Sequence, residues 1–326
     1  MTSIEAPDVL FVLGKGGTGR TTVAASLAAA FANAGESSLL VQWALNDAVS
    51  SLYGLPDTHH EVRKVAPHFH VMNYSFERAV EEYFVSHLGA RQVFEKVIQS
   101  SHIQKLMKAA PGIQELFFLG RIFWLSELCQ KERGWRYKRI IVDAPASGHG
   151  IPLFHIPQSV ARMGIPGPIS YETNRVAEFL ANPEKVGVAV VATPEELPIE
   201  EMMEMLPRIE HVLKREPLFA VLNRCLDSNL FPEGKQHSFS PSTRWWKTAI
   251  ASLENSGNKA HLQAVLDVML QRRKQEGYAL QQLSAKNIPV LKIPDSGFQN
   301  GNVRAHEVIE VCARECERFL YGSNHG

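Results

Sequence analysis

Glycines, basic residues and hydroxyls are combined over Gly14–Thr22 in an order that suits phosphate binding. The stretch reads Gly-Lys-Gly-Gly-Thr-Gly-Arg-Thr-Thr, follows the apolar run Val9–Leu13 and precedes a small-residue segment, Val23–Asn33, that predicts a helix. Glycines let successive backbone N–H groups point at one anion, and a helix N-terminus adds partial positive charge. This strand–loop–helix setting predicts a nucleotide-binding loop. The alternative is a glycine-rich turn that binds no ligand.

Every residue of this phosphate-binding loop is a candidate nucleotide ligand: Gly14, Lys15, Gly16, Gly17, Thr18, Gly19, Arg20, Thr21 and Thr22. Thr21 occupies the hydroxyl position that would hold Mg²⁺ beside the β- and γ-phosphates. A second magnesium candidate is Asp143, because Tyr137–Val142 predicts a strand that runs into it. A carboxylate at the carboxyl end of a strand faces the crevice where open α/β sheets bind ligands. We expect Asp143 to act in catalysis by holding Mg²⁺ through the hydroxyl or a water.

The composition is that of an ordinary folded chain. The 326 residues are 45% hydrophobic and 21% charged, with a formal net charge of zero, so nothing favours nucleic acid as a partner. No apolar run approaches the length of a membrane span and the N-terminus lacks a secretory pattern, so we expect a cytoplasmic protein. The four cysteines form no Cys-x-x-Cys, which leaves a structural zinc site without support.

Apolar strand-like runs alternate with helical patterns, which predicts an α/β fold with a doubly wound, mostly parallel sheet. We find no repeat and no linker, so residues 1–326 are expected to form a single domain with helical insertions at about 75–133 and 243–285. The stretch Ile151–Pro168 is rich in proline and predicts a loop. Asp227–Ser242 is polar and also predicts a loop.

Two details of the phosphate-binding loop depart from the usual pattern. Lys15 is a second basic residue near its start, and Lys-Gly-Gly-Thr-Gly resembles the deviant Walker A motif. In proteins with that motif the lysine reaches across a dimer interface to the partner's nucleotide, so the resemblance implies a catalytic role for Lys15 in trans. The second detail is Arg20, which replaces the usual loop lysine. Its planar fork keeps the charge but is not a conservative substitute for an ammonium.

Four segments in one order resemble the ArsA family of ATPases: the loop, Asp143–His149, Thr193–Leu197 and Asn223-Arg224. That family contains the arsenite-pump ATPase and the ATPase that guides tail-anchored membrane proteins. The likeness runs from about Asp8 to Leu320 and implies a dimeric switch with ATP and Mg²⁺ as cofactors. It also implies nucleotide contacts outside the loop. The Asn223 amide, with Arg224 beside it, resembles the family's adenine contact, and Pro294 with Asp295 resembles the segment over adenine and ribose.

The family's first switch normally carries an aspartate that positions the attacking water, but the corresponding residues here are Ala44-Leu45-Asn46. An alanine side chain cannot accept a proton, and Asp47 is displaced by three residues. With Arg20 also altered, the sequence favours a weakened or inactive ATPase. Such a chain makes sense as the partner of an intact ArsA-like paralogue, with a homodimer as the second possibility.

The functional alternatives are a competent homodimeric ATPase of this family and an interaction module that binds no nucleotide. A hydrophobic membrane-protein client is a further possibility, for which three segments are candidates: Ser75–Leu88, Ile113–Cys129 and the methionine-rich Pro198–Leu213. Apolar stripes of this kind are more often core than groove.

Overall fold

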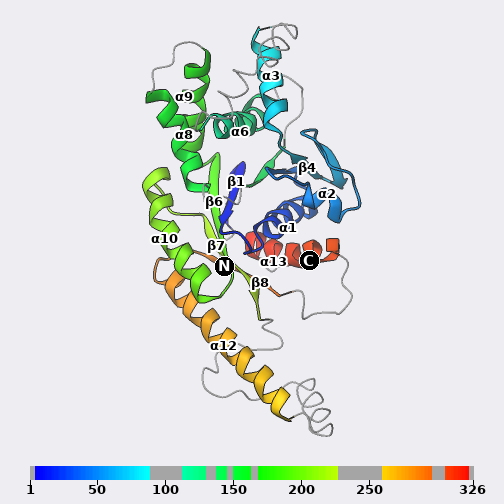
Figure 1. Ribbon diagram of the computed structural model, residues 1–326, viewed down its shortest axis with the longest axis vertical. Helices are drawn as coiled ribbons and strands as arrows, with labels where there is room; N and C mark the ends of the chain where they lie inside the picture. Colours follow the sequence, from blue (N-terminus) through cyan, green and yellow to red (C-terminus); the bar gives the residue numbers. More distant parts are fainter. Residues whose placement is uncertain are drawn as a thin grey trace.

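Eight strands form one sheet in the computed structural model, in the order β3-β4-β2-β5-β1-β6-β7-β8 (Figure 1). The structure describes residues 4–88, 112–129, 137–144, 150–162, 168–226, 259–295 and 305–322. Every neighbouring pair is parallel except β3 with β4, which is antiparallel. The strands are β1 (Val9–Gly14), β2 (Ser38–Gln42), β3 (Arg63–Ala66), β4 (Phe69–Asn73), β5 (Arg139–Asp143), β6 (Val186–Ala192), β7 (Phe219–Cys225) and β8 (Val290–Pro294). The predicted doubly wound sheet is confirmed.

The central strands are apolar along their whole length because helices cover both faces of the sheet. All seven residues of β6 are buried, as are the first five of β1. Strand β1 lies between β5 and β6, so the loop that follows it opens in the middle of the carboxyl edge. This edge is where ligands bind in sheets of this type.

Two hydrophobic clusters lie on opposite faces of the sheet. On one face, α1 (Arg20–Asn33) packs against α13 (Ala305–Tyr321). A short helix, α2 (Ala48–Leu52), adds Val49 to the same cluster. The other face is covered by α3 (Phe76–Leu88), α6 (Ile113–Phe123) with its π-helical extension η1 (Trp124–Leu128), α8 (Gly150–Arg162), α9 (Pro168–Ala181), α10 (Glu196–Leu213) and α12 (Lys259–Ser284). Figure 1 shows α3, α6, α8 and α9 gathered at one end of the molecule and α12 extending toward the other.

The small side chains of α1 let it lie close to both the sheet and α13. Eleven of its fourteen residues are buried, including Ala24, Ala25 and Ala28. The helix begins at Arg20 rather than at the predicted Val23, so its first turn belongs to the phosphate-binding loop. Gly19 precedes it with a left-handed φ of 82°.

One expectation about local structure is wrong, and one pair of strands was not predicted. The proline-rich Ile151–Pro168 is not a loop throughout, because residues up to Arg162 form most of α8. Pro152 lies in the first turn, where its missing N–H costs nothing, and the helix tolerates a buried Pro157 farther along. The strands β3 and β4 have no counterpart among the predicted elements. His68, with φ 57°, sits between them in the turn of this edge hairpin.

All four cysteines are buried, and they are not joined in disulfides. Burial raises the pKa of the Cys225 thiol to about 12 and that of Cys312 to about 11, and it raises the pKa of Cys316 as well. Cys312 and Cys316 lie on α13 in the cluster beneath α1, as expected for small residues on a buried helix stripe. Among the helices of the described segments, none combines the length and apolarity that crossing a bilayer requires.

Candidate functional site

The phosphate-binding loop joins the end of β1 to the start of α1. The Thr18 hydroxyl donates to the Lys15 carbonyl (2.9 Å), which closes the loop on itself. Asn223 at the end of β7 donates from Nδ2 to the Thr18 carbonyl (2.8 Å). A Cβ on Gly19 would overlap this amide nitrogen, and the φ of Gly19 is left-handed, so only glycine fits there. The loop is therefore held by one hydrogen bond within itself and by another from β7.

Thr21 and Asp143, predicted from separate segments, are brought together by the pairing of β1 with β5. The Thr21 hydroxyl donates to Asp143 Oδ2 (2.6 Å). The other carboxylate oxygen, Oδ1, is buried and has no hydrogen-bond partner among the described residues. Burial raises the pKa of Asp143, although the Thr21 hydrogen bond and the charge of Arg20 oppose the shift. A buried carboxylate oxygen without a partner, beside a hydroxyl at the first turn of α1, is a donor set that fits Mg²⁺ or its bound water.

Arg20 turns into the protein. Its side chain is almost fully buried, and Nη1 donates to the Ala144 carbonyl directly after Asp143 (2.8 Å). Burial lowers the pKa of Arg20, and the negative charge of Asp143 opposes this. One guanidinium N–H therefore ties the loop to the end of β5. A lysine at this position would instead direct its ammonium at phosphate.

Lys15 extends from the loop to α10, where its Nζ lies 2.5 Å from Glu201 Oε1. The lysine side chain is 56% exposed and the glutamate 25% exposed. Sequence reasoning missed Glu201, because a glutamate among others in an amphipathic helix carries no signal of its own.

The remaining predicted nucleotide contacts meet at the ends of β7 and β8. The Asp295 backbone N–H donates to the Cys225 carbonyl (2.8 Å), which joins the segment after β8 to β7. Arg272 on α12 bridges the Arg224 carbonyl (2.9 Å) and Asp295 Oδ2 (3.2 Å). Pro294 is the last residue of β8 and therefore lies beside this junction.

The residues in the place of the first switch, Ala44 to Asn46, are exposed, and Leu45 is fully so. Asp47 is buried and caps α2. Its carboxylate accepts hydrogen bonds from the side chain of Gln42 and from the backbone N–H and hydroxyl of both Ser50 and Thr58. Burial opposes the negative charge, but the hydrogen bonds from Ser50 and Thr58 outweigh it and lower the pKa of Asp47. This carboxylate holds the segment in place and has no lone pair left for a water.

The segment Asp143–His149, one of the four that resemble the ArsA family, is described only as far as Ala144. Residues 145–149, including Gly148 and His149, lie outside the described segments, as does Asp227–Ser242. Of the three client-groove candidates, α10 presents no methionine-lined face. Met202 is buried in the core and Met203 and Met205 pack against the same cluster. His60 is buried although it lies in a polar stretch, and its Nδ1 accepts from the Ser75 N–H (3.1 Å).

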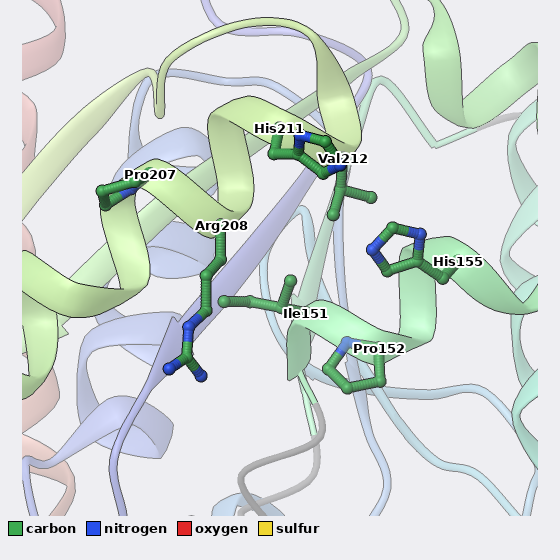
Figure 2. Close-up of a pocket in the computed structure, with 7 residues that line it drawn as sticks. All are labelled: Ile151, Pro152, His155, Pro207, Arg208, His211 and Val212. Carbon is green, nitrogen blue, oxygen red and sulfur yellow. The ribbon is translucent and has the colours of Figure 1, made fainter.

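An open hollow of about 400 Å³ lies between α8 and α10, and none of the predicted site residues lines it. Figure 2 shows His155 on α8 opposite His211 and Val212 on α10. The lining is completed by Ile151, Pro152, Pro207 and Arg208.

Comparison with known proteins reaches the same family as the motifs. Residues 8–164, which contain the loop and Asp143, match the family model for the anion-transporting ATPases, ArsA. The matched segment covers slightly less than half of the chain and agrees with the resemblance carried by the motifs. Similar proteins include ATPase BagA of Mycobacterium tuberculosis and the protein Mb3704 of Mycobacterium bovis, each 25% identical to this chain over 229 residues. The alignment covers 68% of this chain and 66% of each relative, slightly under two thirds of their length.

Proposed function

We propose that this ArsA-family chain is an ATP-binding dimeric switch with weakened or absent hydrolysis. The observation that carries the proposal is the Thr21–Asp143 pair at the end of the phosphate-binding loop on the central strand β1. Within the described segments, Oδ1 of this aspartate has no hydrogen-bond partner. The loop backbone would cradle the phosphates, and Thr21 with Asp143 would hold Mg²⁺. Magnesium, when bound, supplies charge that neutralises the phosphate oxygens.

Three observations support weak hydrolysis. Ala44 stands where the family places a water-positioning aspartate, and the nearest acid, Asp47, already accepts hydrogen bonds at both oxygens. Arg20 is buried against the Ala144 carbonyl instead of presenting a freely placed ammonium to the loop. The site therefore keeps the groups that bind a nucleotide and lacks two groups that would speed attack by water.

Exposed apolar side chains support assembly through the nucleotide-binding edge. Leu45, after β2, is fully exposed, and Leu197, in the first turn of α10 after β6, is 64% exposed. Because β2 and β6 are parallel to β1 and lie on either side of it, both leucines flank the loop at the carboxyl edge of the sheet. We propose that an intact ArsA-like paralogue covers this edge and receives Lys15. A second copy of this chain is the alternative, and a membrane-protein client or partner enzyme would respond to the assembly.

The proposal is tested by melting the chain with and without MgATP and by measuring turnover. We expect MgATP at about a hundredfold over its Kd to stabilise the fold by about 3 kcal/mol. The stabilisation should be lost in Asp143→Ala, while turnover stays near background. Steady turnover that Asp143→Ala abolishes would instead establish a competent ATPase. No change in melting with MgATP would establish an interaction module.

A gain-of-function variant tests the weak-hydrolysis part separately. Arg20→Lys combined with Ala44→Asp restores an ammonium in the loop and a carboxylate in the first switch. We expect turnover to rise by about tenfold or more over the unmodified chain, because each group contributes to the barrier for attack by water. Arg20→Lys alone serves as the control, since it leaves the water without its partner. Equal turnover in all three chains would contradict this part of the proposal.

A further inference from the structure

The lysine that precedes the phosphate cradle is paired with an acid of its own chain. Lys15 Nζ lies 2.5 Å from Glu201 Oε1, and the two residues are 186 positions apart in sequence. Glu201 belongs to α10, which follows β6, the direct neighbour of β1. The fold therefore brings this carboxylate to the entrance of the loop.

We propose that Glu201 is a positioning residue that competes with nucleotide phosphate for the Lys15 ammonium. The inference rests on the proposed function and adds a regulatory step to it. In the nucleotide-free chain Glu201 holds Lys15 against α10. A triphosphate carries more negative charge than one carboxylate and takes the ammonium over, whether the nucleotide belongs to this chain or to a partner.

The exposure of the pair suits an exchange of this kind. Because both side chains contact solvent, their attraction is screened and the pair opens readily. A deeply buried pair would instead lock Lys15 permanently. Other glutamates on the same helix, Glu200 and Glu204, are exposed and make no ion pair with the described residues. They supply matched controls for the charge of α10.

The experiment uses the full chain in five forms: unmodified, Glu201→Gln, Glu201→Asp, Glu204→Gln and Glu201→Gln with Lys15→Gln. The first readout is acylation of Lys15 by an amine-reactive ester without nucleotide, followed by peptide mass spectrometry. We expect Glu201→Gln to speed labelling roughly two- to fivefold, as loss of an exposed ion pair predicts, and Glu204→Gln to leave it unchanged.

The second readout is MgATP affinity at low ionic strength. We expect Glu201→Gln to tighten binding roughly two- to fivefold, with no gain for Glu204→Gln. In the double variant the gain should disappear, which separates competition for Lys15 from simple removal of a negative charge near ATP. Restoring a shorter acid with Glu201→Asp should return both readouts toward the unmodified values.

The outcomes separate the two proposals. An unmodified chain that binds MgATP with the affinity of Glu201→Gln overturns the role of Glu201 and leaves the proposed function intact. A gain that persists without Lys15, or appears equally in Glu204→Gln, also overturns it. A chain that binds no MgATP in any form overturns the proposed function and the competition together.

Discussion

The pKa values of two buried aspartates, Asp143 and Asp47, are shifted in opposite directions. Several hydrogen-bond donors surround the Asp47 carboxylate and lower its pKa, whereas burial dominates at Asp143 and raises the pKa there. The contribution of Asp47 to stability is present above its ordinary pKa and is lost as the pH falls through its lowered folded pKa. The raised pKa of Asp143 works the other way. Its charge disfavours the fold at neutral pH, and this penalty shrinks as the pH falls through the raised pKa toward the ordinary value.

Neutralising each aspartate should therefore shift stability in opposite directions. We expect Asp143→Asn to raise the free energy of unfolding of the nucleotide-free chain by about 1 kcal/mol, because a buried, under-satisfied charge is removed. Asp47→Asn should lower it by about 2 kcal/mol, because a helix cap and several hydrogen bonds are lost. Denaturant unfolding near neutral pH measures both. A loss of stability in both variants would show that the attraction between Arg20 and Asp143 outweighs the cost of burying the Asp143 charge.

The loop glycines differ in what a side chain would meet. At Gly19 a Cβ would overlap the Asn223 amide, and the φ of 82° disfavours any other residue. A methyl group added at Gly16 would meet no atom within 4 Å. We expect Gly19→Ala to lower the free energy of unfolding by about 2 to 4 kcal/mol and Gly16→Ala to change it by less than about 0.5 kcal/mol. Chemical denaturation of the two variants side by side checks this, and equal losses would contradict it.

At the level of elements, α1 depends on small side chains. Ala28 is fully buried between the sheet and α13, and its carbonyl accepts from the Ser38 hydroxyl (2.8 Å). Ala28→Leu should cost about 1 to 3 kcal/mol of unfolding free energy through overpacking. The matched change Ala34→Leu, at the exposed C-cap of the same helix, should cost less than about 0.5 kcal/mol. Thermal or denaturant melts compare the two. A similar cost at both positions would mean that α1 is not tightly packed.

The elements that could be predicted from sequence are those whose apolar pattern reflects their burial. The continuous apolar runs of β1 and β6 are typical of central strands, and the phosphate-binding loop between β1 and α1 is recognised by its residue types. Strands β3 and β4 escape prediction because Arg63, Lys64 and His70 break the apolar run of an edge hairpin. Helix α8 was not predicted because proline usually breaks a helix, although proline is tolerated in the first turn.

The site was predictable where residue type limits the chemistry and not where tertiary contact decides it. Thr21 and Asp143 were singled out because a hydroxyl at a helix start and an acid at a strand end each have few roles, and the structure joins them by a hydrogen bond. The Lys15 partner and the donors around Asp47 come from distant segments that no local pattern connects. The turn of Arg20 into the protein likewise depends on the Ala144 carbonyl, which every sequence would supply.

For the whole molecule, the carboxyl edge of the sheet is the surface on which assembly is expected. Replacing Leu45 or Leu197 with Asp should weaken MgATP-dependent assembly about tenfold or more, because an apolar contact becomes a buried charge. Neither change should alter melting of the isolated chain, since both leucines are exposed. Val268→Asp on α12, which is also exposed, is the control. Sedimentation with a non-hydrolysable ATP analogue measures the effect, and assembly unaffected by both leucine variants would remove this edge from consideration.

The burial of every cysteine makes the chain a convenient background for spectroscopic labels. With raised pKa values and little solvent access, Cys225, Cys312 and Cys316 should resist maleimides, and Cys129 is fully enclosed. A thiol introduced at Leu45 would then be modified selectively without first deleting native residues. A spin label or fluorophore there would report, in solution and in real time, when a neighbouring molecule arrives.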